Sequence, residues 1–294
     1  MKRSSPKTPP EPPSPPAATL PFTRSTVRHL LERYHLAADK KFGQHFLVNG
    51  GVLTSLLEAA TPSTRDTVLE IGPGLGVLTR SLASHAGRVI CVERDSRLLP
   101  ILNEVLQDLS NVHLIPGDAL TFDFSQLPPG SLFASNLPYN IATAILRRAL
   151  AASTFRRLVF MVQREVAERL VARPGQPSFG ALSLVVSYFG QARILRHVAP
   201  GCFHPPPEVT SSIVVIEVSH QGQVNYQLLD FLHQAFRYRR KTLSRSLIHS
   251  GYPKELVQTT LAELGHDPSR VRAETLGLPA LTALHEVLQR DIAT

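Results

Sequence analysis

The amino-acid sequence predicts an α/β fold: a doubly wound, mainly parallel sheet followed by a small all-helical C-terminal domain. Two observations support this prediction. From about residue 67, short β-rich runs alternate with stretches of helical spacing, a pattern typical of a parallel sheet with helices on both faces. After about residue 220 the β-rich runs end and only helical spacing continues. We therefore expect a sheet domain over 23–220 and a helical domain over 221–294.

Five strands are expected in the alternating region. They are Thr67–Ile71, Arg88–Glu93, Val112–Ile115, Ser131–Ser135 and Arg157–Val162, with helical stretches near 76–85, 95–108, 141–152 and 164–172. Two more β-rich runs, Leu182–Tyr188 and Ser211–Val218, follow without a clear helix between them. We expect these two runs to form an antiparallel hairpin at the sheet edge. Four helices are expected in the C-terminal domain, over Tyr226–Phe236, Lys241–His249, Lys254–Leu264 and Pro279–Arg290.

Residues 1–22 contain eight prolines and almost no large apolar side chains. Such a segment cannot bury enough surface to offset its loss of conformational entropy, so we expect a disordered tail. It lacks the apolar centre of a secretion signal. It is poor in acids, as organelle transit peptides are, but its prolines disfavour the amphipathic helix that those peptides form. We expect a cytoplasmic protein and keep organelle import as an alternative.

The composition narrows the class further. With 294 residues, 43% of them hydrophobic, the chain can bury a sizeable core, and it contains no apolar run of about 18 residues that would predict a membrane span. The net charge of +8 favours a polyanionic partner. Two cysteines are too few for a disulfide framework or a four-cysteine zinc site. Cys91 lies in an apolar run and is expected to be a core residue.

A glycine-rich segment, Glu70–Gly76, follows the first expected strand and precedes a helix. Dinucleotide-binding enzymes use a similar turn, so the glycines alone are weak evidence. Pro73 removes an N–H that a phosphate would need, and Glu70 adds negative charge. The segment therefore suits a cationic ligand, such as a sulfonium or an amino group, better than a pyrophosphate.

Two acidic residues mark the carboxyl ends of the next two expected strands, Glu93 as the last residue of its strand and Asp118 just beyond the other. Glu93 lies 21 residues after Gly72 and could accept hydrogen bonds from both hydroxyls of a ribose. Asp118 is placed to accept a hydrogen bond from an adenine amine, although a turn-forming Asp after Gly117 is the alternative. Together with the glycine-rich segment, these acids indicate a ligand that contains adenosine.

The segment Asn136–Tyr139 ends the fourth expected strand, at the edge of the sheet where such folds bind ligands. The amine of adenine is a poor nucleophile because its lone pair is delocalised into the ring. An Asn oxygen and a carbonyl in a proline-fixed turn can accept both of its N–H groups and direct the lone pair at a methyl donor. Tyr139 could stack on the base. The alternative is an ordinary Asn-Pro type of turn at a strand end.

Four motifs then resemble one family, the small-subunit (16S) ribosomal RNA adenine N6,N6-dimethyltransferases. They are Phe42–Leu47, Glu70–Gly76, Asn136–Ile141 and Phe203–Val209, and the resemblance extends over roughly residues 40–290. It implies a Rossmann-like methyltransferase fold and two methyl groups on each of two adjacent adenosines in the hairpin near the 3′ end of 16S ribosomal RNA. The implied partner is an immature small subunit, which gives the protein a role in ribosome biogenesis.

The resemblance also implies the roles of individual residues. It implies that S-adenosylmethionine is held, without a metal, by His45, Leu47, Gly72, Glu93, Asp118 and Asn136. The implied catalytic residues are Asn136, Leu137, Pro138, Tyr139 and Phe203, with Phe203 as a second stacking face; an ordinary core position is the alternative for Phe203. Three positions depart from the common pattern: His45 stands where many members have Asn, Ser135 where Gly is frequent and Ala142 where Ser is frequent.

A basic cluster begins the helical domain and contains Tyr238. Its members are Arg237, Arg239, Arg240, Lys241 and Arg245. Cations bind phosphates and aromatic rings stack on unpaired bases, so we expect RNA contact here; a solvated helix face is the alternative. We expect a monomer that binds no membrane. Two other functions stay open: a related antibiotic-resistance type of methyltransferase acting on large-subunit RNA, and a non-catalytic RNA-binding assembly or organelle transcription factor.

Overall fold

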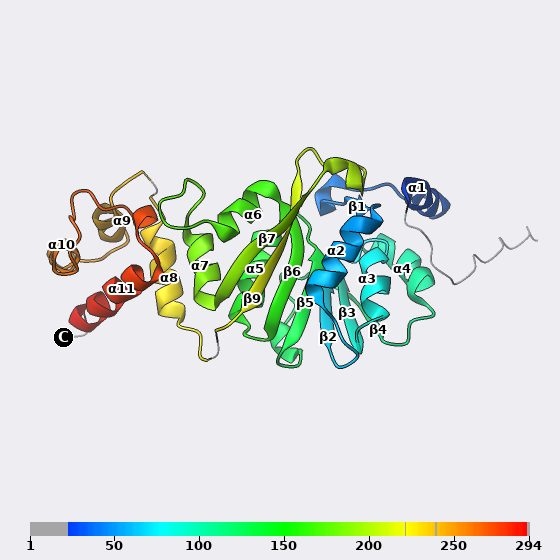
Figure 1. The fold of residues 1–294 in the computed structure, drawn as a ribbon, viewed down its shortest axis with the longest axis horizontal. Coiled ribbons are helices and arrows are strands. Elements are labelled where there is room, and N and C mark those ends of the chain that lie inside the picture. The colour runs from blue at the N-terminus through cyan, green and yellow to red at the C-terminus, as the bar shows by residue number, and fades with distance from the viewer. Residues whose placement is uncertain (1–22, 221, 239, 293–294) are drawn as a thin grey trace, which may run out of the picture.

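A seven-stranded sheet forms the centre of the computed structural model, which describes residues 23–220, 222–238 and 240–292 (Figure 1). The strand order is β4-β3-β2-β5-β6-β9-β7. The strands β2 (Thr67–Ile71), β3 (Arg88–Glu93), β4 (Val112–Pro116), β5 (Ser131–Asn136) and β6 (Phe155–Gln163) are parallel. The predicted fold class and the five predicted strands are thus confirmed. The disordered tail predicted over 1–22 lies outside the described residues.

Two antiparallel strands complete the sheet, β9 (Ser211–Val218) and the edge strand β7 (Gly190–Val198). The expected edge hairpin therefore exists, but its first strand was placed wrongly: Leu182–Tyr188 belongs to helix α7 (Ala181–Phe189). Leu182 and Val186 pack on the sheet, whereas Leu184 packs on the helical domain. Because α7 is buried on two sides, it lacks a polar face, and its apolar run could not be distinguished from a buried strand by periodicity.

Helices cover both faces of the sheet (Figure 1). One face packs on α2 (Gly50–Ala60) and α3 (Val77–Ala83), and the other packs on α5 (Ala142–Ala151) and α7, with α6 (Arg164–Val171) beside them. Successive strand residues point to opposite faces, so Leu69 and Ile71 enter one cluster while Val68 enters the other. Cys91 is fully buried in the α2 and α3 cluster, as predicted.

A smaller apolar cluster joins α4 (Leu99–Leu106) to the N-terminal helix α1 (Arg24–Arg33). Val27 and Leu31 of α1 pack there with Phe46 and Leu75. Phe46 belongs to β1 (Phe46–Leu47), which pairs with β8 (Phe203–His204) in a separate two-stranded sheet. The N-terminal segment is thus fixed at one edge of the main sheet.

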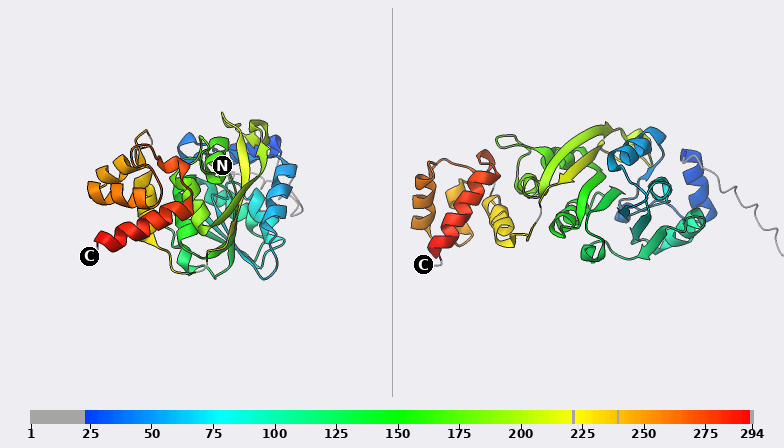
Figure 2. Two further views of the ribbon diagram at one scale, coloured as in Figure 1. Left: turned by 60° about the vertical axis from the view of Figure 1, so that its left-hand side comes forward. Right: turned by 60° about the horizontal axis from the view of Figure 1, so that its bottom comes forward.

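The predicted helical region contains α8 (Tyr226–Ala235), α9 (Leu243–His249), α10 (Lys254–Glu263) and α11 (Leu278–Ile292). It lies at the α7 end of the sheet domain (Figures 1 and 2). Its apolar cluster also contains Ala172, Phe179 and Leu184, which precede the predicted domain boundary. Phe179 is 1% exposed and packs edge-on against Phe236, with ring centroids 5.9 Å apart. The helical region therefore shares its core with the segment around α7.

We expect Phe179→Ala to lower the free energy of unfolding by about 3–5 kcal/mol, because it opens a cavity in this shared core. Tyr226→Ala, at a side chain that is 65% exposed in the same region, should change it by less than about 0.5 kcal/mol. Denaturant titration followed by circular dichroism measures both values. Equal, small effects of the two substitutions would contradict a shared core.

Candidate active site

The candidate site lies at the carboxyl ends of β2, β3 and β5. The strands β3 and β4 lie on one side of β2, and the chain then crosses to the other side to form β5 and β6. The strand order therefore reverses between β2 and β5, and such switch points form ligand clefts. The β2–β5 ladder pairs only Val68 with Leu132 and Leu69 with Phe133. Beyond it the Ser135 hydroxyl donates to the Ile71 carbonyl at 2.6 Å. A side-chain hydrogen bond thus joins the carboxyl ends of the two strands where the ladder has ended.

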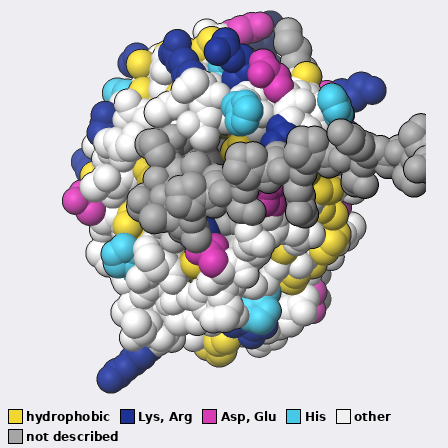
Figure 3. All heavy atoms as spheres, turned by 90° about the vertical axis from the view of Figure 1, so that its right-hand side faces the viewer, with side chains coloured by type: hydrophobic (Ala, Val, Ile, Leu, Met, Phe, Trp, Pro, Cys, Tyr) yellow, Lys and Arg dark blue, Asp and Glu magenta, His cyan; other side chains and the backbone are white. Residues whose placement is uncertain are grey.

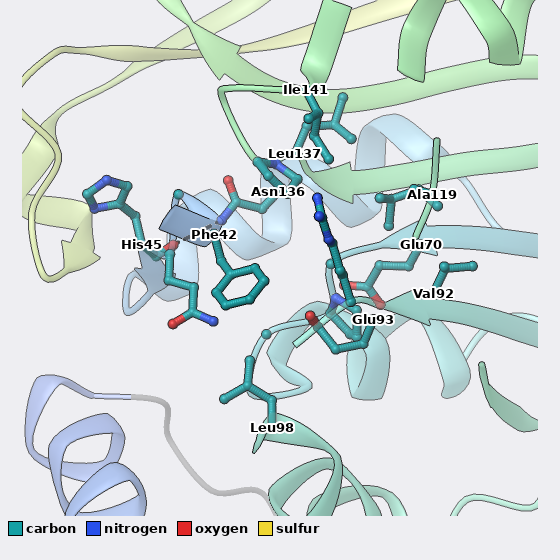
Figure 4. Close-up of a pocket in the computed structure, with 18 of the residues that line it drawn as sticks. Phe42, His45, Glu70, Val92, Glu93, Leu98, Ala119, Asn136, Leu137 and Ile141 are labelled. Atoms are coloured by element: carbon teal, nitrogen blue, oxygen red, sulfur yellow. Dashed lines mark hydrogen bonds between the residues drawn. The ribbon is translucent and has the colours of Figure 1, made fainter. Parts of the chain in front are cut away.

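Three predicted motifs line the cleft at this switch point (Figure 4). The cleft holds about 1030 Å³ of empty space, its open mouth included, and its lining comes from the segments 41–47, 70–78, 92–94, 117–119 and 136–141. Segments far apart in the sequence thus meet at a single site.

The glycine-rich segment allows the other two motifs to pack directly against it. Gly72, Gly74 and Gly76 all have positive φ, at 67°, 61° and 82°. A Cβ on Gly72 would lie 3.4 Å from Cγ of Pro138, and a Cβ on Gly74 would lie 3.2 Å from the ring of Phe46. Side chains at these positions would be strained and crowded, so glycine both shapes the turn and permits the contacts.

Asn136 is oriented by the N-terminal segment. Its Nδ2 donates to the His45 carbonyl at 3.1 Å. Because a carbonyl only accepts, the amide nitrogen must face His45, and Oδ1 remains as an acceptor. Tyr139 is fixed through its hydroxyl, which lies 2.6 Å from Oγ of Ser211 on β9. Leu137 is 1% exposed and anchors the turn in the core beneath the sheet edge.

Two buried carboxyl groups, Glu70 and Glu93, lie in the lining. Burial raises the pKa of each to about 7. Glu70 accepts a hydrogen bond from the Thr79 hydroxyl at 2.7 Å, and Oε1 of Glu93 accepts the backbone N–H of Asp95 at 2.7 Å. A cationic ligand, or one that donates hydrogen bonds, would favour the charged form of both groups.

Asp118 combines the two roles considered for it. Its Oδ1 accepts the backbone N–H of Leu120 at 2.9 Å, which is the turn-forming role. Its side chain also lines the cleft, and Oδ2 lies 3.4 Å from the guanidinium of Arg94. The turn therefore holds the carboxylate at the wall of the cleft.

A hydrogen-bonded latch that sequence reasoning missed holds the N-terminal motif over the cleft. Gln44 donates from Nε2 to Asp95 at 2.7 Å and accepts the backbone N–H of Asp39 at 2.8 Å. Arg97 bonds to both Asp95 and Asp39 and lies over the ring of Phe42, 5.4 Å from its centroid. Only the position of Asp95, two residues after Glu93, gave a sequence signal.

Phe203 and the basic side chains of the helical region lie outside the cleft, whereas His45 belongs to its lining. Phe203 is fully buried in β8 opposite Leu47, which favours the core-anchor interpretation considered for it. The His45 ring points away from Glu93 (Figure 4). The basic side chains Arg237, Arg240, Lys241 and Arg245 are exposed in the helical region, and none of them lines the cleft. Arg239 lies outside the described residues.

The surface charge is mixed at the end of the molecule that carries α1. Lys and Arg side chains on this face stand among Asp, Glu and His side chains (Figure 3). In the helical region, by contrast, Arg237 and Lys241 flank the Tyr238 ring, each 5.7 Å from its centroid. Within the described part of the chain, no group of three His, Cys, Asp or Glu side chains could hold a metal ion. None of the helices described there is long and apolar enough to span a membrane.

Comparison with known proteins identifies the family. The family model described as "Ribosomal RNA adenine dimethylase" matches residues 36–272. The chain is similar to the ribosomal RNA small subunit methyltransferase A of Deinococcus radiodurans, with 42% identity over 91% of each chain. It is similar to the protein of that name from Moorella thermoacetica, with 39% identity over 88% of this chain and 96% of the relative.

Two solved structures share the fold over most of the chain. A dimethyladenosine transferase from Plasmodium falciparum has a TM-score of 0.71 and 26% identity, covering 82% of this chain and 96% of its own. The 23S rRNA methyltransferase ErmE has a TM-score of 0.65 and 25% identity, covering 83% of this chain and 99% of its own. The resemblance predicted from the four motifs is confirmed, and the chain belongs to the ribosomal RNA adenine dimethylase family.

Proposed function

We propose that this enzyme transfers methyl groups from S-adenosylmethionine to N6 of two adjacent adenosines in the 3′-terminal hairpin of 16S ribosomal RNA, and dimethylates each. The observation that carries the proposal is the orientation of Asn136. The His45 carbonyl takes its amide nitrogen, so its oxygen is presented to an amine. Relatives named for the small ribosomal subunit, up to 42% identical, support the substrate.

The cleft fits S-adenosylmethionine, which supplies an activated methyl group on a sulfonium when bound. Glu93 ends β3 and would accept the ribose hydroxyls, and Asp118 would accept the adenine amine. Glu70 places a buried carboxylate where a cationic group is favoured. The turn at Gly72 has no Cβ between the ligand and Pro138. His45 and Leu47 would contribute main-chain contacts, and no metal is involved.

The chemistry requires an amine whose lone pair is directed at the methyl group. The oxygen of Asn136 and a carbonyl of the Leu137–Pro138 turn would accept the two N–H groups of N6, which draws the nitrogen toward a tetrahedral geometry. As the N–C bond forms, nitrogen becomes positively charged and its proton becomes acidic. The proton then leaves to water, so no strong base is needed. Tyr139, held by Ser211, would stack on the base.

RNA binding would extend beyond the cleft. Arg237, Arg240, Lys241 and Arg245 are exposed and, among the described residues, take part in no ion pair, so they are available to phosphates. Arg239 belongs to the same run of sequence. A ligand that reaches both this cluster and the cleft must be much larger than a nucleotide, as the RNA of an immature small subunit is. We propose that the enzyme acts there as a cytoplasmic monomer during ribosome biogenesis.

The large-subunit alternative is less well supported. The methyltransferase named for 23S ribosomal RNA is 25% identical to this chain, whereas relatives named for the small subunit reach 42%. A purely non-catalytic role would not require Asn136 to be held with its oxygen free, nor the glycines that bring Pro138 against the methyl-donor loop.

Asn136→Ala should lower kcat for methyl transfer by roughly 100-fold or more, because the amine loses the acceptor that positions it. Asn103→Ala is the matched control, since this asparagine is exposed on α4 and does not line the cleft, and it should stay within about threefold of the wild type. Mass spectrometry of N6,N6-dimethyladenosine in unmodified small and large subunits measures both rate and target. Product confined to large-subunit RNA would contradict the proposed substrate, and full activity of Asn136→Ala would contradict the mechanism.

The affinity for S-adenosylmethionine should fall as the pH drops below about 7. Glu93, whose pKa is about 7, must lose its proton to accept both ribose hydroxyls, so one group contributes up to about a tenfold loss per pH unit. Glu70 can add a similar dependence. Glu93→Gln should weaken binding at pH 8 and reduce the pH slope by about one proton. Calorimetric titration between pH 5.5 and 8.5, chosen to span about 1.5 units on either side of that pKa, measures this. An unchanged slope in Glu93→Gln would rule out the role of this carboxyl group.

A further inference from the structure

Arg97 joins two parts of the candidate site that lie far apart in the chain. Its guanidinium donates to Asp95 through both Nε and Nη2, each at 2.8 Å. The same Nη2 donates to Oδ2 of Asp39 at 3.1 Å, and Asp39 lies 58 positions earlier in the chain. One guanidinium thus holds the segment 39–44 against the residues that follow β3.

The carboxylate of Asp95 depends on these partners. Its side chain is 3% exposed, and a carboxylate removed from water is costly unless it is paired. Gln44 supplies a second link, because its Nε2 donates to Asp95 at 2.7 Å while its Oε1 accepts the backbone N–H of Asp39 at 2.8 Å. Without Arg97, the buried charge of Asp95 would lose its cationic partner, and Asp39 would lose its ion pair across the gap.

The residues held by Arg97 lead directly to the wall of the cleft. The backbone N–H of Asp95 donates to Oε1 of Glu93 at 2.7 Å, so the position of Asp95 affects the carboxyl group proposed to accept the ribose hydroxyls. Arg97 also lies over the ring of Phe42, 5.4 Å from its centroid. Phe42, Gln44 and Glu93 line the cleft (Figure 4), whereas Arg97 is not among the described residues that line it. Arg97 can therefore act on a ligand only through its neighbours.

The Asn136 turn is held by other contacts. The His45 carbonyl that accepts from Asn136 belongs to the residue just before β1, and β1 is fixed by its pairing with β8. The His45 ring is fixed in addition by Nδ1, which lies 2.8 Å from the Pro205 carbonyl. None of these contacts involves Arg97 or its two carboxylates. Loosening the segment 39–44 should thus disturb the Glu93 wall and leave the orientation of Asn136 in place.

We propose that Arg97 is a positioning residue for the methyl-donor site, an inference that rests on the proposed function. It keeps the segment 39–44 and the end of β3 in one arrangement, and a wall that is already ordered reduces the ordering cost of binding. Arginine suits this position because its planar fork binds a carboxylate through two donors and stacks on an aromatic ring. The affinity for S-adenosylmethionine thus depends on a guanidinium that does not touch it.

The test separates donor binding from methyl transfer. Arg97→Ala should weaken S-adenosylmethionine binding roughly tenfold in calorimetric titration without RNA, the effect of losing about one hydrogen bond to a charged group. With small-subunit RNA, KM for the donor should rise by a similar factor, while kcat at saturating donor stays within about threefold of the wild type.

Arg156→Ala is the matched control. The Arg156 side chain is 46% exposed, against 43% for Arg97, and it also pairs with an aspartate, Asp66, at 2.7 Å. It lies at the start of β6, at the edge of the sheet opposite the cleft. This variant loses a comparable ion pair and should bind S-adenosylmethionine within about twofold of the wild type.

Two further measurements examine the segment 39–44 directly. The backbone N–H groups of Phe42 and Gln44 donate to the Asp39 carbonyl at 3.1 and 3.4 Å. Hydrogen–deuterium exchange of this segment, without ligand, should be roughly tenfold faster in Arg97→Ala and unchanged in Arg156→Ala. Asp39→Asn, which removes the charge facing Arg97 from the other side, should weaken donor binding at least about threefold.

Other outcomes overturn the inference in recognisable ways. Unchanged donor affinity in a folded Arg97→Ala, checked by its melting temperature, would show that Arg97 does not position the site. An equal loss in Arg156→Ala would assign the effect to general stability. A fall in kcat with unchanged donor affinity would assign it to the Asn136 turn. Failure of the wild type to bind S-adenosylmethionine would instead refute the proposed function itself.

Discussion

The hydrogen bond from Asn136 to the His45 carbonyl is the contact on which the arrangement of the site depends. It joins residues 91 positions apart in the chain. For it to form, the segment before β2 must cross the carboxyl edge of the sheet, and two further contacts hold it there. Phe46 packs against the glycine-rich loop, and β1 pairs with β8. One bond thus couples the orientation of the Asn136 amide to the position of the N-terminal motif at the cleft.

The cleft lies at the point in the sheet where the strand order reverses, between β2 and β5. Here the ladder stops after two residue pairs, and Ser135 takes over the Ile71 carbonyl. Ser135, a departure from the common family pattern, therefore adds a bond between the two strands beside the cleft. The absence of side chains at Gly72 and Gly74 then lets the walls approach one another.

The helical region is joined to the sheet domain through packing rather than by a bare linker. α7 contacts the sheet with one side and the C-terminal helices with the other, so its sequence carries no polar stripe. This continuity fixes the basic side chains around Tyr238 relative to the cleft. Under the proposed function, a large RNA would use both surfaces, with phosphate contacts supplying affinity and the cleft selecting the base.

The sequence by itself determined the local features of the sheet domain. The five strands, the glycine-rich turn, the acids at two strand ends and the Asn136 turn all lie where local patterns predicted. These features are local, because β-rich runs, glycines and prolines act over a few residues. Tertiary structure alone decided that 182–188 is helical, that Phe203 is buried, that Gln44, Asp95 and Arg97 form a latch, and that the His45 ring faces Tyr139. Each depends on contacts between distant segments, and no spacing along the chain encodes which face of a ring or helix such a contact will cover.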